Sequence, residues 1–262
     1  MTTARDLQLQ VPNHAPVNAY EARPQDAGAP GVVVIHEAWG VDKHIRDLVD
    51  RLAADGYAAI APNLLGMEVN FKPEVFMQAY GALQQLSPEE RAVPEKIAKA
   101  LEVLPAEFRE PVQKLMGIVM RGATPEGLAA IDAAIAQLRQ QGAKKVAVIG
   151  FCMGGAYSWA AAYHGADAEA FAPFYGRVPE NRDASKVRGA LEGHYGGQDH
   201  GIPVEPIEAA AAELRAAGKE ATIFVYPDAG HAFLNDTRDT FNPDAAKLSW
   251  ERLLKFFERT LR

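Results

Sequence analysis

The chain has a single cysteine, Cys152, among its 262 residues, and it has no long hydrophobic run. One cysteine excludes a disulfide within the chain and suits a reducing compartment. No apolar stretch reaches the roughly 20 residues of a transmembrane helix. The first residues also lack the apolar core of a signal peptide. We therefore expect a cytoplasmic protein that does not associate with membranes.

Positive charge is scarce as well. The 27 lysines and arginines are outnumbered by 34 aspartates and glutamates, which gives a formal net charge of -7. Nucleic acids and anionic membranes attract basic surfaces, so neither is expected as a partner. The hydrophobic fraction of 48% and the charged fraction of 23% are ordinary for a globular protein with a well-buried core.

Strand-like and helix-like patterns alternate along most of the chain. The apolar run at 31–35 predicts a strand buried on both faces, residues 45–55 have helical spacing, and 57–61 predicts another strand. A hairpin over 7–22 is expected at the edge of the sheet. The later expected strands are 145–149, 170–175, 189–195 and 221–226, and the later expected helices are 125–141, part of 202–218, and 248–261. This alternation predicts an α/β fold with a mostly parallel central sheet flanked by helices.

Residues 67–124 interrupt the alternation. The segment is punctuated by prolines, shows helical patterns at 74–86 and 94–104, and has no convincing strand. Long excursions of this kind are usually lids or insertions. We expect one domain over residues 1–262, in which this helical insertion lies over the carboxyl edge of the strands, where open α/β sheets bind ligands. A stabilising flap without substrate contact is the alternative.

The cysteine lies where a strand-like run turns abruptly into a helical one. Gly150 precedes it by two residues and Gly154 follows it by two, which is the cysteine form of the nucleophile elbow. Glycine is expected at both positions because a Cβ there would collide with the elbow or the returning helix. At a helix N-terminus a thiolate is favoured, and the N–H of Met153 would point at a developing oxyanion. A phosphate-binding glycine turn and a buried structural cysteine are the alternatives.

Two later loops, each directly after an expected strand, carry partners for this cysteine. Asp199 lies in the first loop and His231 in the second. Nucleophile, acid and base in this order is the chain order of α/β-hydrolases. His231 would take the thiol proton, and Asp199 would fix the tautomer of the ring. Asp228 is a rival acid and His200 a rival base.

Five short motifs are shared with a known family. They are His36-Glu37-Ala38-Trp39-Gly40-Val41, Gly56-Tyr57-Ala58-Ala59, Gly150-Phe151-Cys152-Met153-Gly154-Gly155, Gly196-Gly197-Gln198-Asp199-His200 and Ala229-Gly230-His231-Ala232-Phe233. With them the chain resembles the dienelactone hydrolases (carboxymethylenebutenolidases), cysteine members of the α/β-hydrolase fold. The resemblance runs from about residue 31 to the C-terminus, apart from the insertion.

The resemblance implies a hydrolase that cleaves a small ester or lactone through a thioester on its cysteine, without a metal or organic cofactor. The site residues that it implies are catalytic Cys152, Asp199, His231 and Glu37, with the backbone N–H groups of Ala38 and Met153 as the oxyanion hole. A non-catalytic binding or regulatory protein of the same fold, whose Glu37 keeps the cysteine unreactive, is the alternative function.

Glu37 follows the expected strand at 31–35, where an unpaired carboxylate would be costly to bury. Beside the cysteine it would disfavour the thiolate or accept the thiol proton. The resemblance implies that such a glutamate acts as a switch, displaced when an acidic substrate binds. A surface Glu37 that caps the next helix is the alternative.

The substrate contacts depart from the family. Trp39, Phe174, Tyr175, Phe233 and Asn235 would line the pocket. Family members that cleave dienelactone carry an arginine where this chain has Asn235, and a substrate-side tyrosine at the position of Phe174. A neutral amide cannot make the bidentate pair that arginine makes with a carboxylate. Arg109 and Arg121 are the candidates for a cation from the insertion. The sequence therefore predicts a small-molecule ester or lactone as partner and leaves its charge open.

Overall fold

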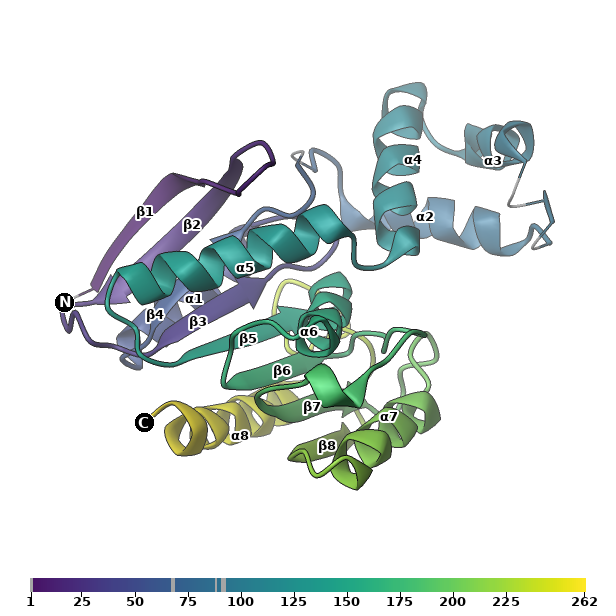
Figure 1. Ribbon diagram of the computed structural model, residues 1–262. Coiled ribbons are helices and arrows are strands. Elements are labelled where there is room, and N and C mark those ends of the chain that lie inside the picture. Colours follow the sequence, from purple (N-terminus) through teal and green to yellow (C-terminus); the bar gives the residue numbers. More distant parts are fainter. Residues whose placement is uncertain (1, 67–68, 88, 91–92) are drawn as a thin grey trace. The chain divides into compact units, whose positions relative to one another are not determined.

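The computed structural model describes residues 2–66, 69–87, 89–90 and 93–262. The chain forms two compact units: Met1–Gly66 together with Gly122–Arg262, and Met67–Arg121. Over the described residues, the first unit contains one eight-stranded sheet with helices on both faces (Figure 1). The predicted α/β fold with a mostly parallel, helix-flanked sheet is confirmed.

The strands lie in the order β1-β2-β4-β3-β5-β6-β7-β8 across the sheet. β1 and β2 form an antiparallel hairpin at one edge, as predicted, and β2 is antiparallel to β4, whereas all other neighbours are parallel. The bounds are β1 Thr2–Leu9, β2 Val17–Pro24, β3 Gly31–Ile35, β4 Ala58–Pro62, β5 Val146–Phe151, β6 Ala170–Phe174, β7 Ala190–Gly196 and β8 Ala221–Tyr226. Because β3 and β5 are parallel neighbours, the loops that follow them meet at one edge.

Two helices cover one face of the sheet and the helices α5 and α6 cover the other. α1 (Lys43–Ala54) and α8 (Pro243–Leu261) share one buried apolar cluster with Val32 and Val34 of β3. The alternate residues of this strand face α5 (Pro125–Gln140) and α6 (Met153–His164). α7 (Val204–Ala216) packs against β8. This two-sided burial explains why β3 is an uninterrupted apolar run.

Side-chain caps set where two of these helices begin. Asp42 accepts a hydrogen bond from the N–H of Ile45 at 3.1 Å and so starts α1. Asn242 accepts one from Ala245 N–H at 3.1 Å, with Pro243 in the first helical turn. α8 therefore begins five residues before the predicted residue 248, because the cap rather than the apolar stripe sets its start.

The unit Met67–Arg121 is helical in its described part. Its elements are α2 Pro73–Gln84, α3 Pro94–Ala100, the short 3-10 helix η2 Leu101–Val103, and α4 Ala106–Arg121. α4 contains Pro111 and was not predicted, although Val112, Leu115 and Met116 give it a buried stripe. Arg109 donates to the carbonyls of Leu104 and Glu102 within the same unit, at 3.0 and 3.1 Å. That this unit covers the carboxyl edge of the sheet stays a prediction.

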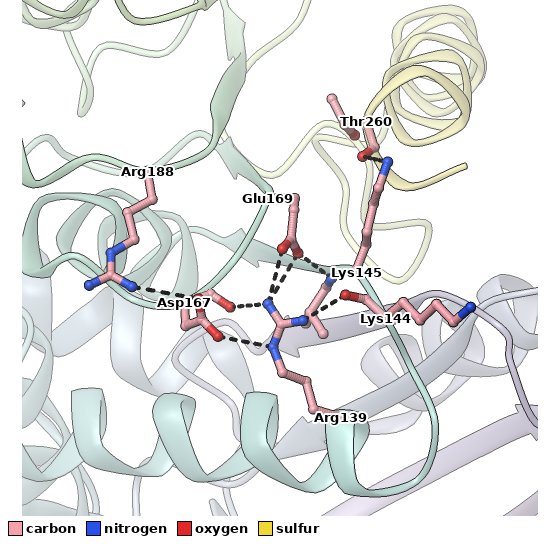
Figure 2. Close-up of polar contacts among 8 residues, drawn as sticks. Arg139, Lys144, Lys145, Asp167, Glu169, Arg188 and Thr260 are labelled. Atoms are coloured by element: carbon pink, nitrogen blue, oxygen red, sulfur yellow. Dashed lines mark hydrogen bonds and ion pairs between the residues drawn. The ribbon is translucent and has the colours of Figure 1, made fainter.

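Charged side chains hold the amino end of β5 (Figure 2). Arg139, at the end of α5, pairs with Asp167 at 3.1 Å and with Glu169 at 3.0 Å. Glu169 in turn accepts a hydrogen bond from the N–H of Val146, the first residue of β5, at 2.7 Å. Lys145 donates to backbone carbonyls at the end of α8, at 3.0 and 3.1 Å. The strand that leads to the cysteine is thus fixed at its opposite end.

Among the described helices, none has the length and hydropathy of a membrane span.

Candidate active site

Cys152 lies half-buried in the turn between β5 and α6, with a left-handed φ of 53°. A side chain is rarely tolerated at such a φ, and strain of this kind is typical of a nucleophile elbow. The turn is held by two backbone hydrogen bonds of 3.1 Å, from Cys152 N–H to the Phe174 carbonyl and from Ala156 N–H to the Cys152 carbonyl. Met153 is the first residue of α6, so its N–H belongs to those that a helix leaves without an intrahelical partner.

The two glycines of the elbow are required by close backbone packing. A Cβ on Gly150 would overlap the carbonyl oxygen of Gly154, and a Cβ on Gly154 would overlap the carbonyl oxygen of Ile35 in β3. Backbone atoms of a central strand and a buried helix cannot move aside easily. The predicted reason for glycine on both sides of the cysteine is confirmed.

Asp199 and His231 follow β7 and β8 and meet at 2.7 Å between Oδ2 and Nδ1. The other carboxylate oxygen, Oδ1, accepts hydrogen bonds from the N–H groups of Gly201 and Ile202 at 2.9 and 3.1 Å. These bonds fix the orientation of the carboxylate. Because an ionised carboxylate can only accept, Nδ1 of the ring donates, and Nε2 is left to face the thiol.

The imidazole of His231 also lies beside Cys152, which is among the groups that act on the pKa of the ring. Burial lowers the pKa of His231, but the neighbouring Cys152 and Asp199 outweigh it and raise this pKa well above its usual value. The rival acid Asp228 and the rival base His200 are both exposed. The structure therefore brings Cys152, His231 and Asp199 together from three separate loops, in the order that a nucleophile, a base and an orienting acid require.

Glu37 is buried, with 3% of its surface exposed, and each carboxylate oxygen has a partner. Oε1 accepts from the Tyr175 hydroxyl at 3.3 Å, and Oε2 accepts from the Asn235 amide at 2.8 Å. Arg238 lies 3.9 Å from Oε2. Burial raises the pKa of Tyr175 well above its usual value, and the charges of Glu37 and Cys152 raise it further, so carboxylate and thiol lie in one neighbourhood. The alternative of a surface helix cap does not hold for this residue.

The loop that carries Ala38, an expected oxyanion donor, is held by His36. Nδ1 of His36 donates to the Glu37 carbonyl at 2.5 Å, and Nε2 accepts from Leu64 N–H at 2.9 Å. Burial lowers the pKa of His36 to about 4, so the ring is neutral near pH 7 and both bonds are possible together. Ala38 itself is buried.

A family model now adds to this geometry. The model of the dienelactone hydrolase family matches residues 17–261. The chain belongs to the dienelactone hydrolase family. It is accordingly a carboxylic ester or lactone hydrolase with the α/β-hydrolase fold.

Similar proteins cover nearly the whole chain. A protein of Escherichia coli K12, provisionally named carboxymethylenebutenolidase, is 31% identical over 255 residues, which is 92% of this chain and 82% of that protein. A protein of Saccharolobus solfataricus with the same provisional name is 32% identical over 253 residues, which is 94% of this chain and 95% of that protein. The crystal structure of a provisionally named dienelactone hydrolase from Klebsiella pneumoniae has a TM-score of 0.69 and 28% identity, covering 98% of this chain and 99% of that one.

Three of the predicted pocket residues have fully buried aromatic side chains, namely Phe174, Tyr175 and Phe233. Tyr175 places its ring 5.2 Å from that of His231 and 5.5 Å from that of Phe233. Phe174 stacks on His194 at 4.3 Å, within the aromatic core beneath the elbow. Tyr175 therefore borders His231, whereas substrate contact by the two phenylalanines stays a prediction.

The two other predicted pocket residues lie beside Glu37. Asn235 is fully buried and donates to Glu37. Trp39 is partly exposed, and the guanidinium of Arg238 lies 4.7 Å from the centre of its ring. Substrate contact by Trp39 or Asn235 also stays a prediction.

Over the described part of the chain, no three His, Cys, Asp or Glu side chains are grouped as metal ligands.

Sequence reasoning did not single out Thr237 or His44. Thr237 donates twice to Asn235 Oδ1, from its N–H at 3.0 Å and its hydroxyl at 2.7 Å. His44 of α1 lies 3.5 Å from Asp236. The run Asn-Asp-Thr is a typical Asx-turn sequence, and this turn chemistry was the available signal for Thr237. The contact of His44 joins residues 192 positions apart in the chain, for which no local pattern exists.

Proposed function

We propose that this hydrolase cleaves a small ester or lactone by transferring the acyl group to Cys152. The observation that supports this best is the hydrogen bond between Asp199 and His231, whose imidazole lies beside the thiol of Cys152. A thiol at an elbow, with an oriented imidazole beside it, is the arrangement that activates a cysteine nucleophile.

In the first half of the reaction, the thiol proton passes to Nε2 of His231 and Sγ of Cys152 attacks the substrate carbonyl. The carbonyl oxygen becomes an oxyanion, which the N–H groups of Ala38 and Met153 would bind. One such donor typically contributes about 2.7–4 kcal/mol to the transition state. When the carbonyl re-forms, the C–O bond to the alcohol breaks, and the leaving oxygen takes the proton from Nε2.

In the second half, a water molecule attacks the thioester and gives one proton to Nε2 of His231. Collapse of this intermediate breaks the C–S bond, releases the carboxylic acid and returns the proton to Sγ. Asp199 holds Nδ1 throughout and stabilises the imidazolium that forms in each half. For a lactone, the alcohol and the acid are parts of one product.

Chromogenic acetate and butyrate esters test this proposal. The wild type is expected to hydrolyse them with turnover and to carry an acyl group, visible by mass spectrometry of the quenched protein. Cys152→Ala should lose both the turnover and the adduct. Equal slow rates for the two proteins would contradict the proposal and would favour the non-catalytic alternative.

A second experiment tests which class of substrate the enzyme prefers. The provisional name of the relatives refers to a lactone hydrolase, whereas Asn235 stands at the arginine position. A rate panel of esters and lactones, each with and without a free carboxylate, separates the possibilities. A strong preference for the anionic members would assign this chain the family's acidic substrates.

A further inference from the structure

β8 is the last strand of the sheet, and its outer side pairs with no strand in the described part of the chain (Figure 1). The hydrogen bonds on its inner side show which of its residues face outward. The carbonyls of Glu220 and Tyr226 accept hydrogen bonds from β7 and from the residue after it, at 2.9 and 2.8 Å. Because alternate residues of a parallel strand bond to the same neighbour, the backbone groups of Ala221, Ile223 and Val225 face the open side.

The two edges of the sheet differ in the features that prevent further pairing. The opposite edge strand, β1, carries Arg5 and Asp6, which pair with Glu21 and Arg46. Charges in an edge strand keep other chains from adding to a sheet. β8 has the sequence Ala-Thr-Ile-Phe-Val-Tyr, which contains no charge and no proline. An uncharged edge of β-branched and aromatic residues is one that a further strand can extend.

Exposed apolar side chains gather at the same edge. Among the described residues of the unit that contains the sheet, the exposed large apolar side chains are Val225, Phe241 and Leu248. Val225 belongs to β8, and the loop of Phe241 is tied to the turn after β8 by a hydrogen bond of 3.0 Å from Asn242. Leu248 lies one helical turn before Arg252, which covers one face of β8. Grouped in this way, such side chains are typical of a surface that another chain covers.

One cation at this edge has no anionic partner among the described residues. The guanidinium of Arg252 lies 4.0 Å from the ring centre of Phe224 and 5.3 Å from that of Tyr226. Glu220 lies on the same face of the strand, at its amino end, and pairs with the exposed Arg259. An antiparallel copy of β8 would reverse the two ends, so that Glu220 of a second chain would lie opposite Tyr226 and beside Arg252.

We propose that β8 is a dimerisation edge, to which a second copy of this chain adds its own β8 antiparallel about a two-fold axis at Ile223. Ala221 of each chain then pairs with Val225 of the other, and Ile223 pairs with its own copy. All the outward backbone groups gain partners, because the Ala221 carbonyl, which accepts from Arg215 at 3.0 Å, has a second lone pair. A second copy is the occupant that the charges favour, since β8 and its flank supply both members of the ion pair.

Sedimentation velocity over a range of concentrations tests this proposal on the whole chain. Wild type is expected to associate reversibly to twice the mass of the chain. Val225→Pro removes one outward N–H and places the proline ring where the second strand would lie, while the bonds to β7 remain. The Kd of this variant should rise about tenfold or more. Val225→Thr, the control, keeps the N–H and should dimerise within about threefold of the wild-type Kd.

Two charge variants test the register. Arg252→Glu leaves only acids at the contact and Glu220→Arg leaves only bases, so each alone is expected to raise the Kd about tenfold or more. A mixture of the two variants brings an acid opposite a base at both contacts, and a heterodimer is expected near the wild-type Kd. Neither side chain is buried, so both variants should fold, which circular dichroism checks. Should Val225→Pro fail to fold, the charge variants decide.

Three results would overturn the inference. They are a wild type that stays monomeric at every concentration, a Val225→Pro dimer as tight as the wild-type dimer, and a mixture of the charge variants that stays monomeric. The second result would assign the dimer to another surface, and an edge that binds only an unrelated extended peptide would appear as the first. Association does not depend on ester turnover, so this test and the test of the proposed function fail separately.

Discussion

At the scale of single residues, the orientation of two side chains in the site depends on hydrogen bonds to the backbone and side chains of their own turns. Asp199 uses Oδ1 for two backbone N–H groups, which leaves Oδ2 for His231. Asn235 uses Oδ1 for Thr237, which leaves its NH₂ group for Glu37. In both cases a tight turn in the backbone selects the atom that faces the site.

Cys152→Ser tests the chemistry at this scale. A serine hydroxyl does not ionise near neutral pH, even at a helix N-terminus, so His231 would have to remove its proton during the attack. We expect kcat/KM for a butyrate ester to fall on the order of 100-fold or more, with an unchanged melting temperature. A serine variant as fast as wild type would mean that the site does not depend on a thiol.

At the scale of elements, the patterns predicted the buried strands best. The strand at 31–35 is observed as Gly31–Ile35, because an apolar run buried on both faces has little freedom at its ends. The first strand begins at Thr2 rather than residue 7, since its early residues are exposed and carry no alternation. Pro111 concealed α4, whose buried stripe forms only once the helix packs.

The site was predictable where a side chain stands next to a glycine turn or directly after a strand. Cys152 and His231 lie in such places, and so does Asp199. The bond between Glu37 and Asn235 was not predictable, because 198 positions separate these residues and only the strand order brings them together. The catalytic role of Cys152 remains a prediction that its alanine and serine variants test.

The loop after β3 offers a pH prediction. The pKa of His36 is lowered to about 4 in the folded protein by burial, against about 6.5 in an unfolded chain. The unfolded state therefore binds this proton first as the pH falls. The stability that the neutral ring contributes is complete above about pH 6.5 and is lost as the pH falls toward 4.

His36→Gln is expected to be less stable than wild type at about pH 7, because one ring hydrogen bond is lost. Its free energy of unfolding should then fall less than that of wild type between about pH 7 and 5, as the titrating ring is absent. Urea unfolding at the two pH values measures both. Buried His194, whose pKa burial also lowers, is present in both proteins and does not affect the comparison.

At the scale of the main unit, the sheet separates two tasks between its two edges. The carboxyl ends of β5, β7 and β8 carry the thiol, the carboxylate and the imidazole. The amino end of β5 carries the Arg139 network, which joins α5, β5 and the start of β6 (Figure 2). The strained turn thus lies at one end of β5, and the ion pairs and the hydrogen bond to Val146 that hold this strand lie at its other end.

Arg139→Ala should expose this division. This substitution removes the partly buried ion pairs with Asp167 and Glu169. Because Glu169 Oε2 also accepts the hydrogen bond from Val146 N–H, the free energy of unfolding is expected to fall by about 1–3 kcal/mol. Arg188→Ala is the control: its side chain is 65% exposed and pairs with Asp167 at 3.6 Å, so the expected loss is below about 1 kcal/mol. Urea unfolding measures both, and ester turnover of the folded variants should stay at the wild-type rate. Equal losses for the two variants, or a loss of turnover without unfolding, would show that the amino edge is not the independent anchor that its geometry indicates.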